Sequence, residues 1–121
     1  MKKAIVLIIT AASIIIACSK SKDATSNGDG GSTLDCSTVS AKTYVTDVSP
    51  IIQSKCATDG NCHGSGSING PGTLLTYSSI FNARTNIRSA VASGAMPLTG
   101  SLTTAQKNSI LCWIDSGAPN N

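Results

Sequence analysis

The sequence has few of the side chains that build a large core or a charged binding surface. Its 121 residues include only four aromatic residues, one histidine and no glutamate, and charged residues make up 12%. Lysines and arginines form no basic run, so neither phosphate neutralisation nor base stacking has the residues that it needs. We therefore expect no nucleic-acid partner.

The sequence also lacks an apolar run long enough to cross a bilayer comfortably. Its longest run, residues 4–17, has fourteen residues and follows two lysines, whereas a transmembrane helix needs roughly 20. A short basic start, an apolar run and a small residue are typical of an export signal. The letters IIAC resemble a bacterial lipobox, in which the cysteine is lipidated. We therefore predict a lipoprotein signal peptide over residues 1–17 and lipidation of Cys18.

The segment that follows is almost free of apolar side chains. Residues 19–33 read SKSKDATSNGDGGST, a composition that cannot bury enough surface to order itself. We predict a lipidated flexible tether over residues 18–35. It would hold the rest of the chain at a bacterial membrane, on the periplasmic or cell-surface side, where disulfides persist.

The remaining domain, residues 36–121, is too small to rely on its core alone. Domains of this size commonly add disulfides, a metal or a cofactor. Of the five cysteines, lipidation takes one and leaves an even set of four: Cys36, Cys56, Cys62 and Cys112.

No alternation typical of strands runs through the chain, and three stretches have helical periodicity. The first covers residues 46–55, the second residues 78–93, and the third follows a capping-box pattern at Thr103 and Gln106. Long glycine-rich loops separate them. The predicted fold is a small all-α bundle of about three helices.

The stretch with the most chemical content is KCATDGNCHG, residues 55–64. Covalent haem attachment usually reads C-x-x-C-H, but here five residues separate Cys56 from Cys62. The direct succession of Cys62 and His63 favours haem, while the wide spacing favours a Cys56–Cys62 disulfide. Zinc is a third alternative, although adjacent residues rarely both reach one tetrahedral ion. These residues alone leave haem and disulfide open.

Met96 favours haem. It is the only methionine after the first residue, and it lies in the loop sequence SGAMPLTG. A haem iron held by histidine often takes methionine as its second axial ligand. The alternative is that Met96 fills a gap in the core.

The order of these motifs resembles the class I mono-haem cytochrome c domain found in bacterial lipoproteins. The motifs are VSPIIQSKC, the C..CH element, GPGTL, GAMP and WIDSGAP, and the resemblance covers roughly residues 44–119. It implies a cytochrome c-like fold with one covalent haem c per chain.

The resemblance also implies a role for each matching residue. Cys56 and Cys62 would bond to the haem, and His63 and Met96 would ligate its iron. The carbonyl of Pro71 would accept a hydrogen bond from the other nitrogen of His63. Four further residues would line the ring or pack near it: Leu74, Ile80, Ile87 and Trp113.

Two features depart from the family pattern: the wider cysteine spacing, and the presence of Cys36 and Cys112. Because class I domains pack their first and last helices together, we predict a Cys36–Cys112 disulfide. Chain-entropy arguments put its contribution to stability at about 4 kcal/mol.

The function expected from the resemblance is electron transfer by a membrane-tethered cytochrome. It would exchange electrons with redox protein partners, alone or as a subunit of a larger oxidoreductase. We expect no enzymatic activity, because both axial positions would be filled and His63 is the only histidine. The alternative is a haem-free, disulfide-stapled surface lipoprotein that acts as a binding or adhesion module.

Overall fold

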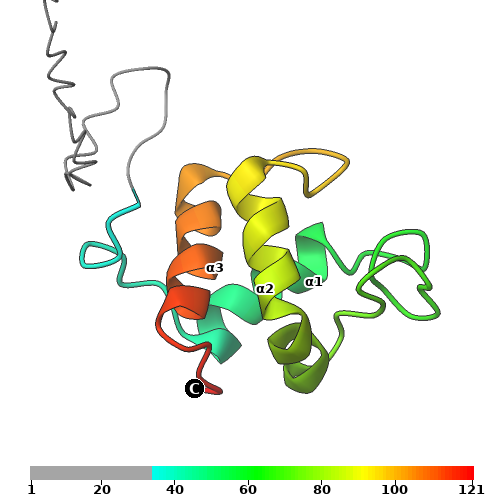
Figure 1. Cartoon of the computed structure of the whole chain (residues 1–121), viewed down its shortest axis with the longest axis horizontal. Helices are drawn as coiled ribbons and strands as arrows, with labels where there is room; N and C mark the ends of the chain where they lie inside the picture. The colour runs from blue at the N-terminus through cyan, green and yellow to red at the C-terminus, as the bar shows by residue number, and fades with distance from the viewer. Residues whose placement is uncertain (1–33) are drawn as a thin grey trace, which may run out of the picture. The chain divides into compact units, whose positions relative to one another are not determined.

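A computed structural model describes residues 34–121 (Figure 1). The predicted signal peptide, the lipidation site Cys18 and all but the last two residues of the predicted tether lie outside the described residues. Within the described part, no helix combines the length and the apolar character that a bilayer span requires.

Residues 34–121 form helices and no strand, which confirms the all-α prediction. A π-helical turn, η1 (Tyr44–Val48), continues directly into α1 (Ser49–Lys55). Two longer helices follow, α2 (Tyr77–Ser93) and α3 (Thr104–Asp115). The first helical segment thus begins two residues earlier than predicted, with a π-helical turn.

Both long helices begin with a capping box. Thr103 and Gln106 form the predicted one, in which each side chain accepts from the backbone N–H of the other residue. Thr76 and Ser79 form a second box at the start of α2. The helix α2 ends at Gly94, whose φ of 77° is the left-handed conformation that favours glycine.

The core lies where the helices meet. Figure 1 shows α2 and α3 side by side, with η1 and α1 crossing behind them, and α3 packs on both α2 and η1. The largest fully buried side chains come from all four segments: Val48, Ile52, Ile80, Ile110, Cys112 and Trp113. The buried residues of α2 follow its helical periodicity, whereas in α3 the five consecutive residues Ser109–Trp113 are all buried.

The four aromatic rings form one connected group, which Phe81 joins through Tyr77 with ring centroids 5.6 Å apart. The ring centroid of Tyr44 lies 5.0 Å from that of Tyr77 and 5.6 Å from that of Trp113. The Trp113 indole N–H donates to the Pro119 carbonyl at 2.9 Å, and the Tyr77 hydroxyl donates to the Ala118 carbonyl at 2.9 Å. The polar atoms of these two rings are thus satisfied, as burial requires.

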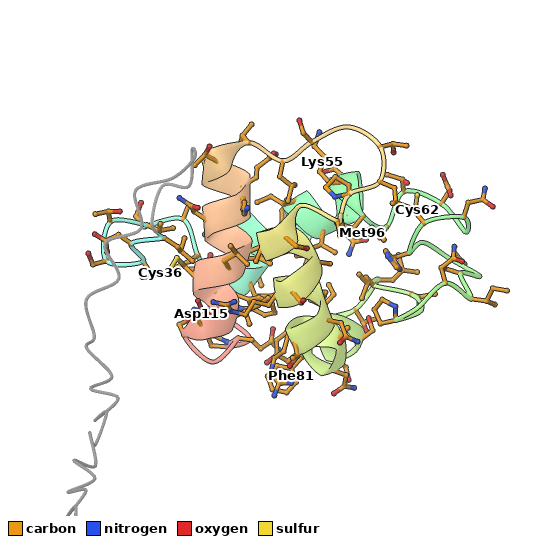
Figure 2. All side chains as sticks on the ribbon, turned by 45° about the horizontal axis from the view of Figure 1, so that its top comes forward. Cys36, Lys55, Cys62, Phe81, Met96 and Asp115 are labelled. Atoms are coloured by element: carbon orange, nitrogen blue, oxygen red, sulfur yellow. A yellow bond between two sulfur atoms is a disulfide. The ribbon has the colours of Figure 1, made fainter. Side chains whose placement is uncertain are left out.

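The predicted disulfide is confirmed. Cys36 and Cys112 are bonded, with their Cα atoms 5.4 Å apart although 76 positions separate them in sequence. The bridge fastens the segment before η1 to α3. Figure 2 shows Cys36 beside α3, on the opposite side of the domain from Cys62 and Met96.

Candidate functional site

A cavity of about 720 Å³ lies between α1, α2, the loop that joins them (residues 56–76) and the loop that follows α2 (residues 94–103). All five residues predicted to bind a cofactor line it: Cys56, Cys62, His63, Pro71 and Met96. They come from positions up to forty residues apart in sequence, so folding brings these separate motifs together at one cavity. The volume falls within the range of about 300–1,000 Å³ that small-molecule and cofactor sites usually have.

Most of the remaining wall is apolar. Its apolar part is formed by Ile52, Leu74, Ile87, Ala90, Val91, Pro97 and Leu98, and its uncharged polar part by Asn61, Asn69, Asn86 and Thr99. Lys55, at the end of α1, is the only charged side chain among the described residues that line the cavity. Such a wall suits a large apolar ligand, since burying apolar surface is worth about 25 cal/mol per Å².

The four residues predicted to lie near a haem ring divide into two groups. Leu74 and Ile87 line the cavity. Ile80 and Trp113 are fully buried in the core and do not line it. The core and the cavity thus draw on different members of this set.

His63 is buried, with 7% of its surface exposed, and its ring is held by one hydrogen bond. Its Nδ1 lies 3.0 Å from the Gly72 carbonyl oxygen. Because a carbonyl only accepts, Nδ1 carries the proton, and in the neutral ring Nε2 keeps its lone pair. No described residue forms a hydrogen bond with Nε2, so this nitrogen is free to bind a metal ion.

The acceptor of this bond corrects one prediction. The sequence predicts that the Pro71 carbonyl accepts from His63, but the Gly72 carbonyl does so, and Pro71 lines the cavity instead. The register of two loop segments explains the shift by one residue. The Leu74 N–H donates to the His63 carbonyl at 2.8 Å, which sets Gly72 opposite the imidazole.

The loop that carries the two cysteines is closed at its base by the backbone. The His63 N–H donates to the Cys56 carbonyl at 2.9 Å, and the Cys56 N–H continues the α1 ladder to the Ile52 carbonyl at 2.9 Å. The site histidine is therefore joined to the end of α1, while residues 59–64 form a separate turn.

Asp59 organises that turn. Its Oδ1 accepts from the N–H groups of Asn61 at 2.8 Å and Cys62 at 3.2 Å. Its carbonyl accepts from the Gly64 N–H at 2.7 Å and from the Cys62 N–H at 3.2 Å. The backbone passes so closely that a Cβ added at Gly64 would lie 2.7 Å from the Asp59 carbonyl oxygen. Only glycine fits at position 64 without a rearrangement.

Cys56 and Cys62 are unbridged thiols. Burial raises the pKa of the Cys56 thiol above its ordinary value, and the proximity of Cys62 raises it further. A thiol with a raised pKa stays protonated at neutral pH and is a poor nucleophile. Cys56 therefore lacks the lowered pKa that the attacking thiol of a thiol–disulfide oxidoreductase needs.

Met96 is held in the loop that follows α2. The chain turns at Gly94, and the Met96 N–H then donates back to the Ala90 carbonyl at 3.2 Å. Figure 2 shows Met96 and Cys62 on the same side of the domain, and both line the cavity. Met96 thus lines the cavity and is not among the residues of the buried core cluster.

Zinc gains no support from the described residues. Nowhere in residues 34–121 do three or more His, Cys, Asp or Glu side chains come together in a metal-binding group. A structural zinc site needs about four such ligands, and Cys36 and Cys112 are already bonded to each other.

Sequence reasoning missed the roles of Asp59 and Gly72. The Asp-Gly-Asn sequence predicts that residues 59–61 turn readily, but not which N–H groups the carboxylate binds. Gly72 has a φ of 93°, and the two glycines around Pro71 are a sign of unusual backbone geometry. Neither pattern identifies the atom opposite His63, since that depends on the register of two loop segments.

No protein-family model matches the chain, and no curated protein or solved structure is significantly similar to it.

Proposed function

We propose that this chain is a c-type haem protein that carries single electrons while a lipid on Cys18 tethers it to a bacterial membrane. One observation carries the proposal: Cys56, Cys62, His63 and Met96 line a single, mainly apolar cavity. Two thiols, an imidazole and a thioether are the complete set of side chains that a covalent haem with two axial ligands requires.

The chemistry of each donor fits this group. The thiols of Cys56 and Cys62 are unbridged and available for thioether bonds. The Nε2 lone pair of His63 and the sulfur of Met96 would be the axial ligands. When bound, the haem would supply one-electron redox chemistry, while the chain supplies binding, orientation and a dry environment.

Other residues of the chain have supporting roles. The Gly72 carbonyl holds the imidazole of His63 in one orientation and one tautomer. The side chains of Ile52, Leu74 and Ile87 exclude water from the cavity wall. Redox proteins would be the partners, and this chain would serve them as a carrier or as a subunit.

The direct test is to express the full chain in a host that exports proteins and matures c-type cytochromes. We expect a red protein whose mass is increased by one haem. The variant His63→Ala should abolish assembly, whereas Met96→Ala should keep the haem but open an axial position, bind carbon monoxide and lower the potential. Ile68→Ala is the control, because it removes an exposed apolar side chain that does not line the cavity and contains no sulfur.

Two outcomes would contradict the proposal. One is a colourless, stably folded protein from that host, with Cys56 and Cys62 bonded to each other. The other is an unchanged low-spin spectrum in His63→Ala, which would show that another residue is the proximal ligand.

A second candidate function uses the same fold without haem. The Cys36–Cys112 bridge and the packed aromatic core stabilise the domain independently of any cofactor. The domain would then be a stapled surface module that binds an apolar molecule in the cavity. A colourless protein that binds a fluorescent apolar probe, and loses that binding in Ile87→Asp, would favour this candidate.

A further inference from the structure

The turn between the two cysteines sets this chain apart from an ordinary C-x-x-C-H site. Five residues separate Cys56 from Cys62. The hydrogen bond from the His63 N–H to the Cys56 carbonyl spans the base of this turn. The additional residues must therefore form a local turn that leaves both cysteines at the cavity wall.

Asp59 accepts the hydrogen bonds that close this turn. Four hydrogen bonds from three N–H groups, those of Asn61, Cys62 and Gly64, end on its Oδ1 or its carbonyl oxygen. The Asn69 side chain adds a bond from outside, donating to the Asn61 carbonyl at 2.6 Å. The turn is thus closed around one residue, and two of the four bonds hold the backbone of Cys62.

We propose that Asp59 is a positioning residue that keeps Cys56 and Cys62 as two separate thiols on the cavity wall. The purpose of this arrangement rests on the proposed function, because thioether formation requires reduced cysteines. In that reaction each S–H adds across one vinyl double bond: a carbon–sulfur bond forms, and the hydrogen goes to the neighbouring carbon.

The competing reaction is closure of a Cys56–Cys62 disulfide. It removes two electrons and two protons from the thiols, and oxidised glutathione can accept them to give two molecules of reduced glutathione. A disulfide requires Cβ atoms about 3.5–4.5 Å apart and a restricted dihedral angle. The two bonds to Asp59 Oδ1 are made in the unbridged conformation, and a substitution that removes this oxygen should shift the equilibrium towards the bridge, although the two bonds to the Asp59 carbonyl stay possible.

The experiment measures that equilibrium in haem-free protein. The full chain is exported in a host without c-type haem maturation and equilibrated in glutathione buffers. The free thiols are then alkylated, the protein is digested, and the mass of the peptide that contains Cys56 and Cys62 is measured by mass spectrometry. Asp59→Ala should raise the bridging constant about tenfold, which corresponds to ~1.4 kcal/mol. Asp59→Asn keeps an Oδ1 acceptor and should behave like the wild type.

Asp47→Ala is the matched control. Asp47 also accepts a backbone N–H, that of Thr43 at 2.8 Å, but it lies at η1, outside the turn. Its loss removes an aspartate and a comparable bond, and it should leave bridging unchanged. Circular dichroism and an intact Cys36–Cys112 peptide verify that each variant is folded.

The proposal is overturned if folded Asp59→Ala bridges no more readily than the wild type, or if Asp59→Asn is as defective as Asp59→Ala. A second readout uses the maturing host, where Asp59→Ala should increase the fraction of chains attached by one thioether. If the wild type takes up no haem but Asp59→Ala still bridges more readily, the proposed function fails and the positioning role stands.

Discussion

The two sides of the domain use the same residue type in opposite ways. Beside α3, Cys36 and Cys112 are bonded, and nearby Trp113 is buried with its N–H satisfied. On the cavity side, Cys56 and Cys62 remain thiols. One pair of cysteines closes the structure, whereas the other remains available for chemistry.

The two sides of the domain also differ in which residues stabilise the fold and which form the cavity. The aromatic rings that dominate the core of a small protein lie on the α3 side, and none of them lines the cavity. The cavity wall is built from aliphatic side chains and loop residues instead. The α3 side should therefore determine the free energy of unfolding, and the cavity side should determine ligand binding.

The largest expected effect comes from Trp113→Ala. The indole is fully buried and loses both its packing and its bond to Pro119, so we expect the free energy of unfolding to fall by about 3–5 kcal/mol. Urea denaturation of haem-free full-length protein measures it. Ile68→Ala is the control, because Ile68 is 97% exposed and its loss should change stability by less than about 0.5 kcal/mol.

Removing the disulfide is the next largest change. The double variant C36S/C112S releases a constraint across 76 positions and should cost about 2–4 kcal/mol in the same assay. The matched pair C56A/C62A removes two thiols that form no bridge and should cost clearly less. If both double variants lose the same free energy of unfolding, the difference assigned to the α3 side and the cavity side is contradicted.

A moderate effect is expected from Gly64→Ala. The added Cβ would lie 2.7 Å from the Asp59 carbonyl oxygen, and relieving such overpacking typically costs about 1–3 kcal/mol. Gly70→Ala is the control in the same loop, since a Cβ there meets no atom within 4 Å. If the two variants are equally stable, the close turn around Asp59 is wrong.

The smallest effect is expected at the exposed ion pair between α2 and α3. Arg88 Nε lies 2.6 Å from Asp115 Oδ1, and exposed pairs contribute little because water and salt screen them. The Arg88 guanidinium lowers the pKa of Asp115 below the ordinary value of 3.8. The contribution of the ion pair to stability is thus fully present above pH 3.8, and it is lost as the pH falls through the lowered pKa of Asp115.

The measurement for this pair is the melting temperature of the wild type and of Arg88→Ala, at neutral pH and in acid below the lowered pKa of Asp115. The small difference at neutral pH should shrink in acid, where Asp115 becomes protonated, and also at high salt. A difference that grows on acidification would contradict a lowered pKa for Asp115.

Local features of the sequence predicted much of the fold. The 3.6-residue periodicity locates the inward-facing residues of α2 but not those of α3, where Ser109–Trp113 are all buried, and the capping box at Thr103 is confirmed. The start at Tyr44 was missed, because the first turn is π-helical and does not follow that periodicity. The motifs also identified five residues that share one cavity.

The predictions that failed or were missed concern contacts between segments. The acceptor opposite His63 is Gly72 and not its neighbour Pro71, because the Leu74 N–H sets the register of two loop segments. The role of Asp59 depends on which N–H groups the folded turn brings within reach. Neither is encoded in a short motif.

The sequence by itself determined the helices and the supply of chemical groups: four cysteines after Cys18, one histidine and one internal methionine. The tertiary structure decided how these groups are used. Four cysteines allow three pairings, and a choice among them depends on which distant segments the packed core brings together. Helix periodicity is a property of neighbouring residues, whereas pairing and cavity formation are properties of the whole fold.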